Sequence, residues 1–152
     1  MKKLALLLPL ILLVGCTNEV EENKYSYLEY KHELEEADKF TSSDEIEFNT
    51  YFNIERETEE IVKYSITIKD FKIDMFDVKV LLIHDYMQDE AYPSIGILDN
   101  SIEVKKDSED EIYLEGKIQT IDDIKDVKFK LYLEYIDNEG LKNKVYYQLS
   151  RG

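Results

Sequence analysis

The segment Val127-Lys-Phe-Lys-Leu-Tyr-Leu-Glu-Tyr135 decides the fold class. Every second position, from Val127 to Tyr135, is apolar, which is the period of a β-strand with one face in a core. Asp137-Asn-Glu-Gly140 follows and supplies a glycine where a hairpin turn needs a positive φ. The segment therefore predicts a strand that turns back into an antiparallel partner.

The same period of two recurs along the chain, in residues 46–54, 62–68, 112–118 and 145–149. Residues 78–86 are apolar on both faces, which predicts a central strand. Phe71, Ile73 and Met75 change the parity of the pattern, which predicts a bulge or a crossing between sheets. Short strands separated by turns predict an all-β fold, an antiparallel β-sandwich of about seven to nine strands.

Residues 25–39 are ambiguous. Leu28, Tyr30, His32 and Leu34 alternate with charged residues, so we expect a strand over 28–34. The Glu, Lys, Leu and Ala content of the same segment would also suit a helix. No Gly/Ser-rich or Pro-rich linker divides residues 25–152, which we interpret as a single domain.

The amino terminus has the features of an export signal. Lys2 and Lys3 precede an apolar run that is shorter than the ~20 residues needed to span a bilayer. Residues 13–16, Leu-Val-Gly-Cys, resemble the lipobox of bacterial lipoproteins. The resemblance implies that residues 1–15 are a signal peptide cleaved between Gly15 and Cys16, and that Cys16 carries a diacylglyceryl group. We expect residues 16–24 to be the lipidated cysteine and a flexible tether.

Such an anchor predicts a location on the extracytoplasmic face of the cell membrane, because two buried acyl chains hold firmly. The chain has a formal net charge of −15, and removal of Lys2 and Lys3 makes it more acidic. This charge disfavours nucleic acid as a partner and attracts cationic ligands. Cys16 is the only cysteine, so packing alone must hold the fold.

A second resemblance covers residues 112–140. The segments 114–118 (Leu-Glu-Gly-Lys-Ile), 124–129 (Ile-Lys-Asp-Val-Lys-Phe) and 135–140 (Tyr-Ile-Asp-Asn-Glu-Gly) resemble FxLYD-type immunoglobulin-like modules of bacterial envelope proteins. Gln119-Thr120 stands where an Asn is usual. The resemblance implies an immunoglobulin-like sandwich that binds or spaces, and it implies no functional residues.

Candidate catalytic groups are few. His32 and His84 are the only histidines, and both fall at predicted inward positions, which favours core histidines. A zinc site formed by these two with a carboxylate is the alternative. The sequence lacks Gly-x-Ser-x-Gly, a phosphate loop, Cys-x-x-Cys and His-Glu-x-x-His, so we expect neither an enzyme nor a cofactor. The acidic segment 107–111 is interpreted as a solvated turn, with calcium binding as the alternative.

These features predict a non-enzymatic binding or accessory module for an envelope protein or a cationic ligand. Tyr51, Tyr132 and Tyr146 fall on the polar sides of their strands, where they would form either a contact patch or scattered exposed aromatic residues. One alternative is an immunity or exclusion lipoprotein against a toxin or phage. The other is a metal-binding or enzymatic domain that uses His32 and His84.

Overall fold

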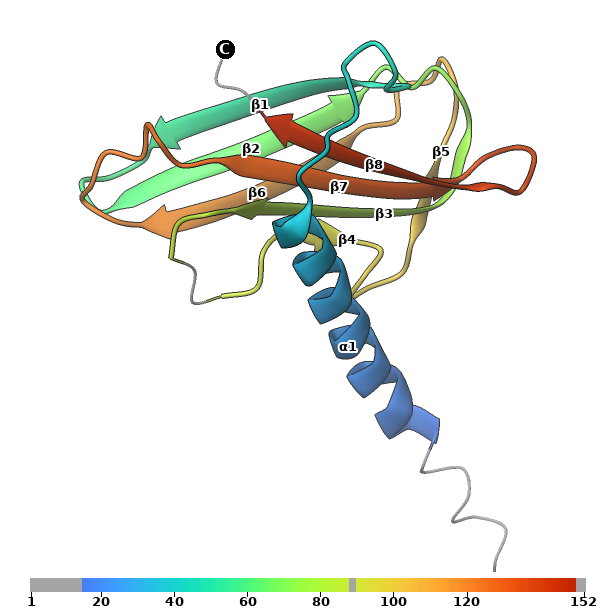
Figure 1. Ribbon diagram of the computed structural model, residues 1–152, viewed down its shortest axis with the longest axis horizontal. Coiled ribbons are helices and arrows are strands. Elements are labelled where there is room, and N and C mark those ends of the chain that lie inside the picture. Colours follow the sequence, from blue (N-terminus) through green and yellow to red (C-terminus); the bar gives the residue numbers. More distant parts are fainter. Residues whose placement is uncertain (1–14, 88–89, 150–152) are drawn as a thin grey trace, which may run out of the picture.

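The computed structural model describes residues 15–87 and 90–149, which contain one helix and eight strands (Figure 1). Most of the predicted signal peptide, residues 1–14, therefore lies outside the described part. The elements are α1 (Gly15–Glu36), β1 (Asn49–Arg56), β2 (Ile61–Lys69), β3 (Met75–His84), β4 (Ser94–Ile95), β5 (Ile102–Val104), β6 (Ile112–Gln119), β7 (Phe129–Ile136) and β8 (Lys142–Leu149).

The strands form two antiparallel sheets that pack face to face. The first sheet has the order β1-β2-β6. The second has the order β4-β3-β7-β8, and β5 also pairs with β3. The prediction of an all-β sandwich is confirmed, with a strand number inside the expected range.

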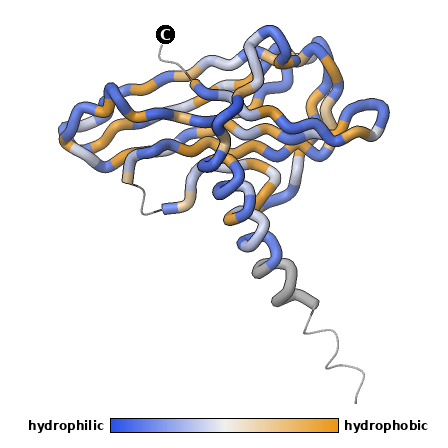
Figure 2. The backbone as a smooth tube through the Cα atoms, in the orientation of Figure 1, coloured by the Kyte–Doolittle hydropathy of each residue, from blue (hydrophilic) through white to orange (hydrophobic). Residues whose placement is uncertain are grey.

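The predicted period of two shapes the core between the sheets. In β2 the residues Val62, Tyr64, Ile66 and Ile68 are buried, while their neighbours are partly exposed. Figure 2 shows the resulting alternation of apolar and polar positions along the strands. The central position predicted for 78–86 is also confirmed, because β3 lies between β4 and β7 and is buried along most of its length.

The chain crosses from the first sheet to the second between β2 and β3. Asp70 has a φ of 57° at the end of β2, and the buried Phe71 follows it. The register then shifts between Met75 and Val78, where Asp77 has a φ of 50°. The predicted change of parity over 71–75 therefore corresponds to a crossing with an adjoining bulge.

The strand predicted over 28–34 is wrong, because this segment belongs to α1. Tyr27 and Leu34 are buried, and Tyr30 is partly buried, so one helical face is repeated every three or four residues. This face packs on the outer side of the second sheet against a cluster that contains Leu81, Ile83 and Tyr132. Burial of that cluster favours the helix over an additional strand.

The flexible tether predicted for 17–24 is also wrong, since these residues are helical. Only the carboxyl-terminal half of α1 contacts the sandwich, and the amino-terminal half extends away from it (Figure 1). In this free half, the side chains are described from residue 22 onward, and residues 22–25 are exposed. A helix is stiffer than a flexible linker, so α1 sets both the spacing and the direction of its amino end.

Candidate functional site

The two histidines do not form a common site. His84 is buried at the end of β3, as predicted, but His32 is exposed on α1, so its predicted inward position is wrong. The His84 Nδ1 accepts a hydrogen bond from the Tyr86 backbone N–H at 3.2 Å, and its ring contacts Tyr64, Tyr92 and Phe129. Residues 15–87 and 90–149 contain no group of three His, Cys, Asp or Glu side chains placed to hold a metal ion.

The acidic turns use their carboxylates to order the backbone. Asp110 accepts a hydrogen bond from the Lys105 N–H at 2.9 Å. In the β7–β8 turn, Asp137 accepts bonds from the N–H groups of Glu139 and Leu141 and from the Asn143 amide. These bonds hold the pKa of Asp137 below its ordinary value, with the largest contribution from the Leu141 N–H. The carboxylates therefore have structural roles in these turns.

The predicted tyrosine patch is wrong for two of its three members. Tyr51 is 52% exposed on β1, as expected. Tyr132 is fully buried and Tyr146 is half-buried, because α1 covers this side of the second sheet. The rings of Tyr30 and Tyr146 both contact Tyr132, with centroids 5.2 and 5.4 Å away.

A polar network joins α1 to the second sheet. Glu134 on β7 is 2% exposed and accepts hydrogen bonds from the hydroxyls of Tyr132 at 3.0 Å and Tyr30 at 3.4 Å. Lys79 lies 3.5 Å from the same carboxylate, which compensates its buried charge. Burial raises the pKa of Tyr132, and the nearby charge of Glu134 raises it further. The network thus fixes the helix without leaving Glu134 unpaired.

Two further contacts fix the outer side of the helix. Glu33 accepts a hydrogen bond from the Tyr146 hydroxyl and forms an ion pair with Lys144 at 3.0 Å. Burial raises the pKa of Glu33, but the bonds from Tyr146 and Lys144 outweigh it and leave that pKa lowered. Lys130 closes the carboxyl end of α1 by donating to three carbonyl oxygens there, those of Leu34, Glu35 and Ala37.

A cleft of about 490 Å³ lies beside this end of α1. Its polar lining is mostly engaged in the fold. The Lys130 ammonium binds the helix carbonyls, and the Asp85 carboxylate accepts the Lys128 N–H at 2.8 Å. The cleft therefore has the volume for a small molecule, and its lining, among the described residues, contains no serine, threonine, tyrosine or cysteine.

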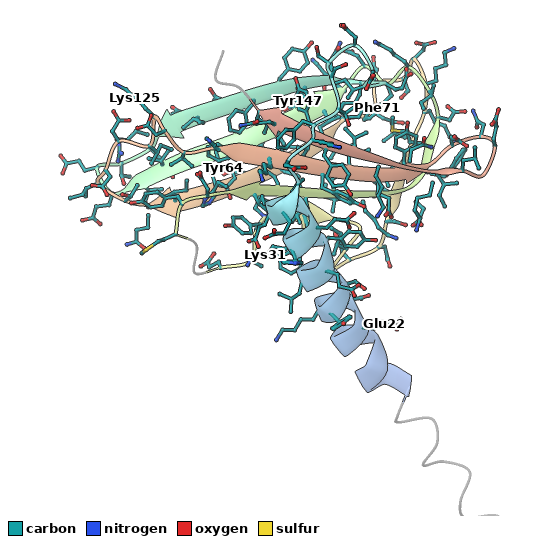
Figure 3. The ribbon with its side chains drawn as sticks, in the orientation of Figure 1. Glu22, Lys31, Tyr64, Phe71, Lys125 and Tyr147 are labelled. Carbon is teal, nitrogen blue, oxygen red and sulfur yellow. The ribbon has the colours of Figure 1, made fainter. Side chains whose placement is uncertain are left out.

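A second concave surface follows β1, where the first sheet faces β8. Two hollows of about 460 and 370 Å³ share Thr50, Tyr51 and Tyr147, so they form one groove along the strand. Phe52 and Leu149 supply apolar lining to it. Figure 3 shows Tyr147 beside β1, away from Lys31 of α1. We call this surface the β1 groove.

The backbone register leaves one edge of β1 open. The Glu57 N–H donates to the Ile61 carbonyl at 2.9 Å, and this pair continues the register Glu55↔Lys63. Hydrogen-bonded pairs alternate in an antiparallel ladder, so the odd-numbered residues of β1 bond to β2. The N–H and C=O groups of the even-numbered residues Thr50, Phe52 and Ile54 therefore point away from β2.

The corresponding edge of β8 is covered at Tyr146. By the same alternation Tyr146 points away from β7, and Thr41 takes up both of its backbone groups. The Thr41 N–H donates to the Tyr146 carbonyl at 2.7 Å, and the Tyr146 N–H donates to the Thr41 hydroxyl at 3.3 Å. Within residues 15–87 and 90–149, no such bond covers Thr50, Phe52 or Ile54. The open edge of β1 could not be found from the sequence, because it depends on the strand order.

Comparison with known proteins adds no relative, since no family model, curated protein or solved structure matches the chain. Among the described helices, none has the length and apolar character needed to cross a membrane. The backbone of Cys16 lies in the first turn of α1. The functional interpretation therefore depends on the β1 groove and on the geometry of α1.

Proposed function

We propose that this chain is the precursor of a lipid-anchored, extracytoplasmic binding module without catalytic activity. The motif at residues 13–16 supports cleavage before Cys16 and lipidation of its thiol. The observation that carries the proposal is the position of Cys16 at the free end of α1, whose other end is docked on the second sheet. In this proposal α1 is a stalk between the bilayer and the sandwich.

The β1 groove supports binding as the activity. It combines apolar lining, exposed tyrosine and an edge of unpaired backbone groups, which is a surface suited to a protein segment. The acidic charge of the chain favours a cationic partner, either an envelope protein or a smaller ligand.

The anchor is tested by expressing the full precursor and the variant Cys16→Ala in a bacterium that processes lipoproteins. We expect the wild-type protein to enter the membrane and detergent phases, with a mass that shows diacylglyceryl on Cys16. The variant should remain unprocessed or leave the membrane. Thr17→Ala is the matched control and should behave as the wild type. A wild-type chain with an unmodified Cys16 would contradict the proposal.

A further inference from the structure

We propose that the open edge of β1 binds an extended peptide as an additional antiparallel strand, and that this peptide alternates apolar and basic residues. The inference names the partner class for the binding role proposed above and is independent of the lipid anchor. It rests on the free backbone groups of β1, the groove beneath them and the charges beside them.

The backbone geometry favours strand addition at β1. Thr50, Phe52 and Ile54 present three successive pairs of N–H and C=O groups along one edge. Exposed edges are commonly protected by proline, by lysine or by a covering segment. β1 contains no proline and no lysine, whereas Thr41 covers the edge of β8 at Tyr146. The edge of β1 is thus available for a new strand.

The other outer strand of this sheet, β6, is less suitable. Glu115 and Lys117 lie along it, and they form ion pairs with Lys63 at 3.8 Å and Glu57 at 3.1 Å. A hollow beside it is lined by Ala91 and Pro93 as well as by β6, so another segment flanks this strand. An incoming strand at β6 would meet both the charges and that segment.

The groove determines which side chains the peptide carries on its inner face. Thr50, Phe52 and Ile54 point toward the core but remain partly exposed, unlike the buried inner residues of β2. Directly opposed residues of an antiparallel pair point to the same face. Apolar side chains opposite these positions would therefore enter the groove beside Tyr147.

The outer face carries carboxylates that suit basic side chains. Asp70 accepts hydrogen bonds from the Asn49 amide at 3.0 Å and the Tyr51 hydroxyl at 3.5 Å, and it has no ion pair among the described residues. Glu55 likewise has no ion pair there, because Lys63 opposite it is paired with Glu115.

The facing charges are not uniformly negative. Lys69 lies with its ammonium 4.9 Å from the centre of the Tyr51 ring. The carboxylates of Asp70 and Glu55, which form no ion pair among the described residues, nevertheless flank the outer face of β1 near its opposite ends. Lysine or arginine at every second position of the peptide would reach both of them.

The test uses the mature chain in detergent micelles and a fluorescent peptide, (Lys-Val)4-Lys, with binding followed by anisotropy. The valines are the residues that should bond to Thr50, Phe52 and Ile54. A peptide N-methylated at its valines should therefore lose binding at least tenfold, whereas one N-methylated at its inner lysines should bind as the parent does. An equal loss of affinity with the two N-methylated peptides would overturn the proposal. So would the absence of binding by both the parent peptide and the peptide N-methylated at its inner lysines.

Protein variants test the same contacts from the other side. Thr50→Pro removes an outward N–H while keeping the β1–β2 ladder, so we expect about tenfold weaker binding, and Thr50→Val should bind normally. The double variant Asp70→Asn/Glu55→Gln should weaken binding more than Glu109→Gln/Asp126→Asn, which has the same net charge. Equal effects of the two double variants would show that long-range charge alone acts, and would refute a local site.

Three outcomes separate the possible occupants and the two proposals. Self-association that Thr50→Pro abolishes, without any peptide binding, would show that β1 takes a second copy of the chain and would overturn the inference. Peptide binding by a chain that proves to carry no lipid would support strand addition at β1 and contradict the proposed lipid anchor. A lipidated chain that binds no peptide would leave the anchor intact and refute the docking site.

Discussion

Gly116→Ala is expected to destabilise the sandwich through a single contact. Gly116 lies opposite Tyr64 in the β2–β6 ladder, and the Tyr64 ring lies across it. A Cβ built at Gly116 would be 2.2 Å from both Cζ and the hydroxyl oxygen of Tyr64. Ordinary carbon contacts begin near 3.5 Å, so the ring would have to move by more than 1 Å.

The Tyr64 ring has little room for that movement. It is fully buried, with ring centroids of Phe129 and His84 at 5.1 and 5.3 Å. Overpacking of this kind costs about 1–3 kcal/mol, while replacement of a strand glycine by alanine returns roughly 0.5–1 kcal/mol of backbone entropy. We therefore expect a net loss of about 1 kcal/mol, and at most about 2.5 kcal/mol, in the free energy of unfolding.

Urea unfolding monitored by circular dichroism measures this loss, because the midpoint falls while the m-value is unchanged. Gly116→Ala is compared with Tyr64→Leu and with the double variant, since leucine leaves space for the new methyl group. The double variant should lose less stability than the sum of the single losses. Additive losses, or a Gly116→Ala protein as stable as the wild type, would refute the argument that Tyr64 requires a glycine.

Three other perturbations have defined outcomes. Tyr64→Phe should leave stability unchanged or raise it by up to about 2 kcal/mol, measured by urea unfolding, because the buried Tyr64 hydroxyl has no hydrogen-bond partner among the described residues. Lys130→Met should cost about 1–3 kcal/mol and speed amide exchange in the last turn of α1, since three carbonyls lose their donor. Between pH 8 and 10 stability should be constant, and it should fall above pH 10, because burial raises the pKa of Tyr64 and Tyr132 in the folded state and that of Tyr92 to about 12. The unfolded chain then loses protons first as the pH rises, and a thermal unfolding series between pH 8 and 12 measures the effect.

The strands were predictable because their signal is local. In β2 the alternation of apolar residues already separates the buried face from the other, and in β7 it marks the face that enters the core between the sheets, although α1 also covers the opposite face. Asp137 to Gly140 supplies the chemistry of the turn. The crossing near Phe71 was visible as a break in the same alternation. These features depend on neighbouring residues alone.

The helix was misread because two periods share residues. Tyr30 and Leu34 belong both to the alternation 28–34 and to the helical face that begins at Tyr27. A window that included Tyr27 and ended at Leu34 would have shown the spacing of three and four residues. The errors at Tyr132 and Tyr146 follow from this one, because their cover is α1.

The β1 groove depends on information that no short segment holds. Asn49–Arg56 has the same alternating pattern as a strand in the middle of a sheet. Its open edge results from the order β1-β2-β6 and from the fact that Thr41 reaches β8 instead. Edge status is a property of the assembled sheets, so the site required the structure.

The proposed stalk and the proposed docking edge are consistent in their geometry. Cys16 lies about 11 helical positions before Tyr27, the first buried residue among the described side chains, which corresponds to a rise of about 16 Å. The helix docks on the second sheet, whereas β1 belongs to the first, on the side of the sandwich away from the free end of α1 (Figure 1). A bilayer at Cys16 would therefore leave the β1 edge facing outward, accessible to an extended segment of another envelope protein. Two glycines inserted into the free half of α1 should make the orientation of the sandwich relative to the bilayer less fixed. The affinity of the protein for the peptide in micelles should not change.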